Sequence, residues 1–191
     1  HDHDHPGQQR RLAPATIARH VATLKSFGSW LEQRRLVPGN PASRLRTPKT
    51  PRSLPRVLTQ EQISRVLDRT AARAESGEPG LIRDHAVLEL LYSSALRVSE
   101  LTSLRLDGFD RRERSVRVLG KGNKVRIVYL NDACKDALKS YLAVRRPISG
   151  RDHNALFLSS RNERISRSSV HALVKKHLSA AGLDASEYSS H

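Results

Sequence analysis

Cysteine is nearly absent from this sequence of 191 residues, which has only Cys134. A single cysteine can form neither an internal disulfide nor a zinc site built on thiolates, and this fits a reducing, cytoplasmic setting. Long hydrophobic runs are also missing. The stretch from Ala86 to Leu91 is far too short to cross a bilayer, and no charged-then-apolar signal opens the chain. These absences exclude a disulfide scaffold and a membrane-inserted protein.

Acidic residues are scarce relative to basic ones. The chain has 19 Asp and Glu against 34 Lys and Arg, which gives a formal charge of +15 and a pI of about 11.0. An excess of this size favours a polyanionic partner, because neutralising phosphates releases their condensed counterions. Charge alone does not separate DNA from RNA, an anionic membrane surface or a merely soluble basic surface. Together with the helical periodicity described below, it favours nucleic acid.

The first five residues, His1 to His5, alternate histidine with aspartate, and both side chains ligate divalent metals. A stretch that ends at once in Pro6 and Gly7 has no scaffold to fix ligand geometry. We therefore interpret it as a frayed terminus and expect no metal site there.

Periodicity and proline content divide the chain into two parts joined by a linker. Apolar residues recur at helical spacing from Pro14 to about Arg35, namely Ile17, Val21, Leu24, Phe27 and Leu31. Five prolines and several basic residues follow over 38–57, a composition that forbids a regular helix and favours an extended basic linker. The sequence thus predicts a helical region over 1–37, a linker over 38–57 and a second domain over 58–191.

The second domain is predicted to be mainly helical, an α+β fold with a small antiparallel sheet. Thr59 and Gln62 form a capping-box pattern at its first helix. A second helix over 83–92 weakens at the small residues 93–95. The remaining elements are a hairpin whose strands flank 120–123, a helix from Asn131, a short strand at 155–158, and a helix from Ser166 that Gly182 ends.

Two positively charged residues occupy positions suited to chemistry. Arg97 follows the weakened end of a helix, and Lys121 is placed at the tip of the hairpin. Cations delivered from separate elements suit a phosphodiester, because its negative charge grows in the transition state. Alone, Arg97 could equally be a surface arginine, and Gly120 to Lys124 an ordinary polar turn.

The segments 91–101, 119–126 and 189–191 together resemble the tyrosine recombinase (phage integrase) family, of the Xer type, and the resemblance runs from about Thr16 to His191. It implies a helical catalytic domain over 58–191, preceded over 1–37 by part of a core-binding domain that clamps DNA. Members of this family break double-stranded DNA through a 3′-phosphotyrosyl link, with no metal or cofactor.

The resemblance also implies roles for individual residues. Arg97 would stabilise the pentacoordinate phosphorane, Lys121 would protonate the departing 5′ oxygen, and His191 would assist proton transfer. Four further residues are expected to contact DNA. Lys124 and Arg126 would bind phosphates, and the helix start at Arg167 and Ser168 would dock in the major groove.

The sequence departs from the family pattern at two places. Ala95 stands where a glycine is common, which is tolerable if its φ is negative. The chain ends at His191, before the second arginine and the nucleophile, and none of the tyrosines at 92, 129, 141 and 188 matches that nucleophile. We therefore expect this chain to bind duplex DNA without cleaving it, and its parent to act as a tetramer in the nucleoid.

Two other hypotheses for the function stay open. The first is a non-catalytic DNA-binding module or regulator derived from an integrase. The second is a metal-dependent nuclease or transposase, which would need clustered carboxylates. The candidate carboxylates show no ligand pattern in the sequence: Asp84, Glu89, Glu100, Asp107 and Asp110.

Overall fold

The computed structural model describes residues 12–49, 57–110, 112, 114–120, 122, 124–146 and 153–184. The chain forms two compact units, His1–Leu54 and Pro55–His191, and the division between them falls inside the linker predicted over 38–57. None of the described helices is long and apolar enough to cross a membrane.

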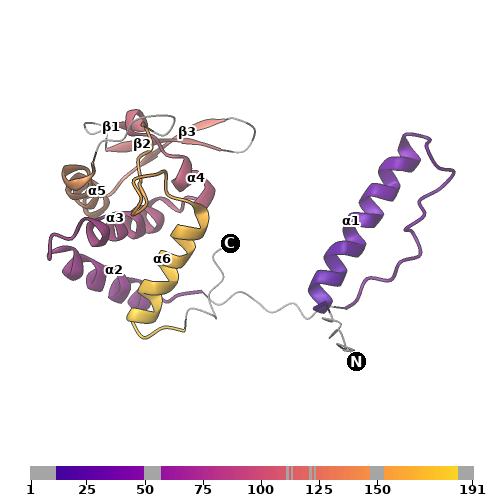
Figure 1. Cartoon of the computed structure of the whole chain (residues 1–191), viewed down its shortest axis with the longest axis horizontal. Coiled ribbons are helices and arrows are strands. Elements are labelled where there is room, and N and C mark those ends of the chain that lie inside the picture. The colour runs from indigo at the N-terminus through magenta and orange to yellow at the C-terminus, as the bar shows by residue number, and fades with distance from the viewer. Residues whose placement is uncertain are drawn as a thin grey trace, which may run out of the picture. The chain divides into compact units, whose positions relative to one another are not determined.

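The first unit is built on one helix, α1 (Pro14–Gln33), which begins with proline at its first turn (Figure 1). The chain then returns alongside the helix, where the Asn40 side chain donates to the Lys25 carbonyl at 3.0 Å and to Ser29 Oγ at 2.9 Å. Gly28 permits this approach, because a Cβ there would lie 2.0 Å from Asn40 Oδ1. The first part of the predicted linker therefore packs on α1.

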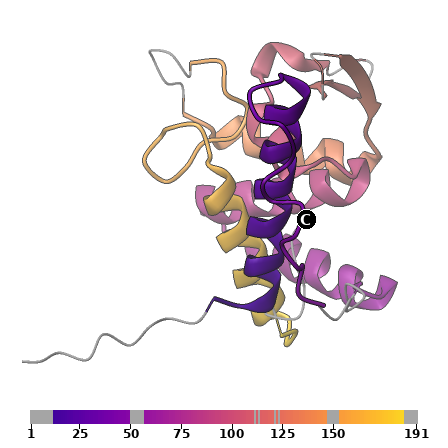
Figure 2. The same ribbon diagram turned by 90° about the vertical axis from the view of Figure 1, so that its right-hand side faces the viewer.

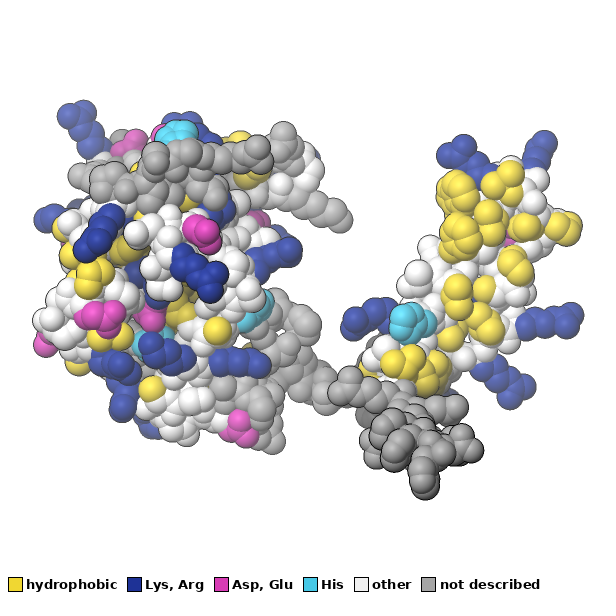
Figure 3. Space-filling model, in the orientation of Figure 1, with side chains coloured by type: hydrophobic (Ala, Val, Ile, Leu, Met, Phe, Trp, Pro, Cys, Tyr) yellow, Lys and Arg dark blue, Asp and Glu magenta, His cyan; other side chains and the backbone are white. Residues whose placement is uncertain are grey.

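The apolar face of α1 is mostly exposed in the described part of the chain. Only Val21 and Gly28 are buried, whereas Leu24, Phe27 and Trp30 are exposed. The Phe27 and Trp30 rings stack at 5.9 Å. Figure 3 shows hydrophobic side chains gathered on the viewed face of this unit.

The second unit packs four longer helices with a small sheet. The helices are α2 (Gln60–Ala74), α3 (Pro79–Ser94), α5 (Asp132–Val144) and α6 (Arg167–Ala180), with the short α4 (Val98–Ser103) and the 3₁₀ turn η1 (Leu106–Gly108) between them. The antiparallel strands, in the order β1 (Phe109–Asp110), β2 (Ser115–Leu119) and β3 (Val125–Tyr129), lie at one end of the unit beside α4 (Figures 1 and 2). The predicted mainly helical fold with a small antiparallel sheet is confirmed.

Side-chain caps set the helix starts that the sequence predicts. Gln62 N–H donates to Thr59 Oγ1 at 3.2 Å, and Thr59 N–H donates to Gln62 Oε1 at 2.8 Å, which completes the capping box of α2. Asn131 accepts from the Cys134 amide at the start of α5, and Ser166 accepts from the Ser169 amide at the start of α6.

The core of the second unit surrounds α3, which packs against α2 and α5. Leu90, Leu138 and Phe157 are fully buried there, and the Phe157 ring stacks on Tyr141 at 5.2 Å. Cys134 is buried as well, and burial raises the pKa of its thiol to about 11, so it is an unreactive core residue.

The prediction of a short strand at 155–158 is wrong. Ala155 bridges to Arg105, whereas Leu158 bridges to Arg164, so the two ends of the segment pair with different partners. The apolar run that suggested a strand is buried all the same, because Leu156 and Phe157 fill the core. Burial alone therefore produced the strand-like pattern.

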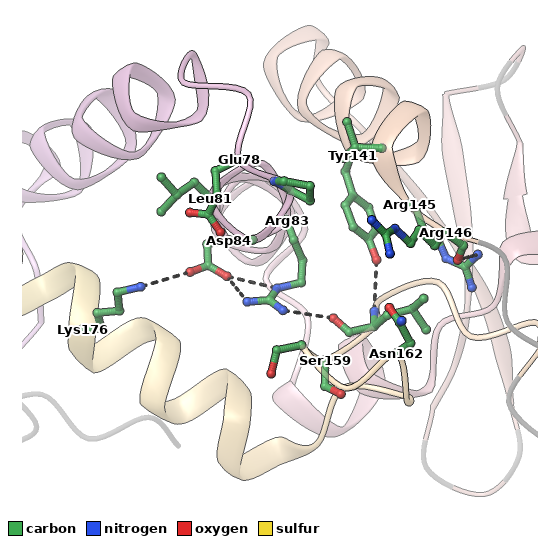
Figure 4. A pocket seen from close by; sticks show the side chains of 15 residues that line it. Glu78, Leu81, Arg83, Asp84, Tyr141, Arg145, Arg146, Ser159, Asn162 and Lys176 are labelled. Atoms are coloured by element: carbon green, nitrogen blue, oxygen red, sulfur yellow. Dashed lines mark hydrogen bonds and ion pairs between the residues drawn. The ribbon is translucent and has the colours of Figure 1, made fainter.

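An ion cluster joins α3 to α6. Asp84 Oδ1 accepts from Arg83 Nη2 at 2.6 Å, and Asp84 Oδ2 lies 3.1 Å from His177 Nε2 and 3.8 Å from Lys176 Nζ. Figure 4 shows Arg83, Asp84 and Lys176 of this cluster beside a cavity of about 380 Å³, with Tyr141 and Arg145 across from them. Burial opposes ionisation of Asp84, but hydrogen bonds from His177 and Arg83 outweigh it and lower its pKa.

Ala95 ends α3 in the left-handed region, with φ 47 and ψ 34, so the condition under which alanine would be tolerated there, a negative φ, is not met. A left-handed backbone strains any residue with a Cβ, and glycine relieves that strain. Ala95→Gly is therefore expected to raise the free energy of unfolding by about 0.5–1 kcal/mol.

Urea denaturation measures this effect, with Ala72→Gly on exposed, regular α2 backbone as the matched control. The control is expected to lose stability, because glycine has a lower helix propensity than alanine. Losses of similar size at both positions would contradict the strained conformation of Ala95.

Candidate functional site

Arg97 is the N-cap residue of α4, immediately after the bend that ends α3. The left-handed Ala95 turns the chain, and buried Leu96 anchors the bend in the core. Arg97 then has an extended backbone, and its side chain is 76% exposed. The main chain of the bend is thus fixed while the guanidinium is presented to solvent.

Glu100 collects hydrogen bonds from both arginines of the site. Its side chain is only 5% exposed. Its Oε2 accepts from the Arg97 amide at 2.9 Å, and its Oε1 accepts from Arg97 Nη1 at 3.3 Å. Arg126 donates from Nη1 to Oε1 at 2.8 Å and from Nη2 to Oε2 at 2.9 Å. Hydrogen bonds from Arg126, assisted by Arg97 and opposed by burial, lower the pKa of Glu100 to about 2.

The predicted hairpin is present, formed by β2 and β3 in antiparallel register with Leu119 opposite Val125. The Gly120 amide donates to the Lys124 carbonyl at 2.8 Å and closes the turn. Lys121 falls outside the described residues, and so does His191. The position of the hairpin tip is therefore given by Gly120, the residue before Lys121.

One cavity of about 490 Å³ joins the helix bend to the hairpin. Its lining comes from both elements: Arg97, Ser99, Glu100, Ser103, Leu119 and Gly120. The helix bend at Arg97 and the hairpin at Gly120 therefore meet at a single hollow although they are 23 positions apart in the sequence.

The residues expected to contact DNA fall into two places. Lys124 is exposed beside the hairpin turn, while Arg167 and Ser168 are exposed at the start of α6, where Ser168 Oγ lies 2.8 Å from Ser166 Oγ. Both terminal nitrogens of Arg126, which is expected to bind a phosphate, donate to Glu100. Spacing along the chain gave no sign of this partner.

Arg164 is a site-supporting residue that sequence reasoning missed. Its Nη1 donates to the Thr102 carbonyl at 3.0 Å and to the Leu104 carbonyl at 3.5 Å, near the end of α4. It thereby links the segment before α6 to the helix that carries Glu100. No local sequence signal distinguishes it from the other arginines.

Comparison with known proteins agrees with this geometry. The sequence model described as the Phage integrase family matches residues 56–191. The chain belongs to the phage integrase family. It is 40% identical over 168 residues to the tyrosine recombinase XerC of Mycobacterium tuberculosis (strain ATCC 25177 / H37Ra), covering 85% of this chain and 56% of that protein. It is 41% identical over 171 residues to XerC of Alcanivorax borkumensis, covering 89% and 55%.

Solved structures of the family have the same fold. The XerA recombinase crystal structure superposes with a TM-score of 0.58 at 25% identity, covering 92% of this chain and 57% of that one. A pre-cleavage complex of XerH with its difH substrate gives a TM-score of 0.68 at 17% identity, covering 91% and 50%. The Xer-type resemblance is confirmed, and the chain spans about half the length of the curated relatives it matches.

Proposed function

We propose that this chain is a DNA-binding portion of a site-specific recombinase, and that Arg97 and Lys121 act on one phosphodiester of duplex DNA. The observation that carries the proposal is the hollow shared by Arg97 and Gly120. It is supported by the excess of basic residues, which Figure 3 shows spread over the viewed face of the molecule, and by the family's DNA-bound structures.

The proposed chemistry follows from the groups at the hollow. A guanidinium presents two parallel donors, so Arg97 can grip two phosphate oxygens as charge develops on them. A tyrosine hydroxyl would attack phosphorus and form the 3′-phosphotyrosyl bond while the bond to the 5′ oxygen breaks. Lys121 would give that oxygen its proton, and His191 would assist the proton transfer near the nucleophile.

A second part of the proposal concerns DNA contacts away from the hollow. Lys124 would bind a phosphate beside the hairpin. Arg167 would reach a base edge in the major groove, while Ser168 and the first amides of α6 would bind the backbone. Residues 1–37 would form part of the DNA clamp and 38–57 a linker along the backbone, with a tetramer in the nucleoid as the working assembly.

Lys124→Gln is expected to weaken duplex binding uniformly across DNA sequences, because a phosphate contact carries no base information. One lost phosphate contact should reduce the slope of log K against log salt concentration by about 0.9. Fluorescence polarisation of a labelled duplex from low to moderate salt measures this slope. Lys139→Gln, on the exposed surface of α5, is the control, and equal slopes in the two variants would contradict the contact.

Incubation of the chain with nicked duplex DNA tests the function as a whole. Salt-dependent binding without a covalent adduct is expected, and an adduct would reveal a nucleophile within this chain. Cutting that requires magnesium would instead support a metal-dependent nuclease. The structure disfavours that reading, because Asp84, Glu100 and Asp107 pair with different arginines at separate places. A chain that fails to bind duplex DNA would overturn the proposal.

A further inference from the structure

Arg126 ties the hairpin to the helix that begins at Arg97. It extends from β3 to α4, where its two terminal nitrogens face the two oxygens of Glu100 at 2.8 and 2.9 Å. Paired donors on a planar guanidinium match a carboxylate in this way, and lysine cannot reproduce the geometry. Although Arg126 is 43% exposed, both terminal nitrogens are engaged.

The pairing of Arg126 with Glu100 also affects how strongly Glu100 binds the Arg97 guanidinium. A carboxylate that is 5% exposed requires compensating positive charge. Among the described residues, Arg97 and Arg126 are the charged groups that contact it. Without Arg126, the compensation would fall to Arg97, whose Nη1 already lies 3.3 Å from Oε1. Arg126 therefore lessens the hold of Glu100 on the Arg97 guanidinium, whose bond to Oε1 is longer, at 3.3 Å, than the two bonds from Arg126, at 2.8 and 2.9 Å.

The same pair sets the base of the hairpin turn. A Cβ at Gly120 would lie 3.3 Å from Arg126 Nη1 and 3.9 Å from Glu100 Oε1, so this backbone rests directly against the pair. The Gly120 amide in turn donates to the Lys124 carbonyl. The point from which Lys121 departs is thereby held beside α4.

We propose that Arg126 is a positioning residue, which competes with Arg97 for Glu100 and fixes the hairpin base against α4, and that it does not contact DNA itself. This inference rests on the proposed function, because it assigns Arg97 to a DNA phosphate. It replaces the expectation, drawn from the sequence, that Arg126 binds phosphate.

The affinity of Arg126→Gln for duplex DNA, followed against pH, tests the inference. At pH 7 the unpaired Glu100 captures Arg97, and affinity is expected to fall about tenfold, the equivalent of one charged hydrogen-bonded contact. Removing Arg126 removes the largest cause that lowers the pKa of Glu100, so acidification is expected to protonate Glu100 at a higher pH in the variant than in the wild type, to release Arg97 and to shrink the deficit relative to wild type. In the wild type the pKa of Glu100 is about 2, and Glu100 stays charged and paired above that pH.

The double variant Glu100→Gln/Arg126→Gln is the matched control, because it removes one charge of each sign. It leaves no carboxylate to capture Arg97, so its salt slope is expected to equal that of the wild type, and its affinity relative to the wild type is expected not to change with pH. A phosphate contact by Arg126 would instead reduce the slope of the double variant by about 0.9 and would overturn the inference. Circular dichroism checks that each variant folds. If Arg126→Gln does not fold, Arg126→Lys takes its place, and we expect it to show the same pH trend.

The two failures can be distinguished. A wild-type chain without salt-dependent duplex binding overturns the proposed function and this inference with it. Wild-type binding, combined with a pH-independent loss in Arg126→Gln, overturns the inference alone.

Discussion

Replacing Arg97 with glutamine in a recombination-competent form of the protein is expected to slow strand cleavage by about 100- to 1,000-fold, the cost of losing one preorganised donor to a developing oxyanion. The guanidinium is 76% exposed and its backbone is fixed by the bend after α3, so it meets a phosphate with little rearrangement. Duplex affinity should fall far less, because the interaction strengthens as charge grows in the transition state.

Single-turnover cleavage of a nicked duplex, at saturating protein, measures this effect separately from binding. Arg97→Lys keeps the charge but loses the paired donors, so a substantial part of the defect should persist. Arg105→Gln is the control, because Arg105 pairs with exposed Asp107 and does not line the hollow. Unchanged cleavage in Arg97→Gln would refute the role of Arg97 at the phosphate.

The second large effect is expected on the stability of the folded protein. Asp84→Asn should lower the free energy of unfolding by about 3–5 kcal/mol at pH 7, the cost of removing one partner from a buried ionic cluster. The Asp84 side chain is 4% exposed, and the change leaves Arg83 and His177 without their carboxylate. Urea denaturation measures the loss, and Asp136→Asn on the exposed surface should change stability little.

The loss from Asp84→Asn should also depend on pH. The pKa of Asp84 is lowered in the folded protein, below its ordinary value of 3.8. Its stabilisation is therefore fully present above pH 3.8 and disappears as the pH falls through the lower folded value. The difference between wild type and variant should shrink below pH 3.8, and a constant difference down to pH 2 would argue against ionised Asp84 as its source.

Local signals in the sequence predicted the starts of α2, α5 and α6 and the hairpin correctly, whereas α3 begins at Pro79, four residues before its predicted start. The capping residues Thr59, Asn131 and Ser166 bond to amides three positions along the chain, so their patterns are visible in a short window. The strands of the hairpin are likewise neighbours in sequence. By contrast, the apolar segment 155–158 was misassigned, because its two ends bridge to segments on opposite sides of it in the chain.

The geometry of the site depends on contacts between residues that are far apart in the sequence, and no short stretch of sequence reveals them. Arg126 meets Glu100 across 26 positions, and Arg164 meets the end of α4 across about 60. An arginine on a strand has the same local signature whether it faces a phosphate or a buried carboxylate. The positive φ of Ala95 was also unforeseen, because the packing of Leu96 and α4 against the core determines that bend.

The sequence by itself determined the class of fold, the order of the longer helices and the hairpin, and the two segments that carry the candidate chemistry, because caps, periodicity and turn residues act over a few positions. Only the tertiary structure decided that the Arg97 bend and the hairpin share one hollow, and that Arg126 is engaged by Glu100. Burial of a carboxylate demands a partner, but which distant cation satisfies it is fixed by how the helices and the sheet pack.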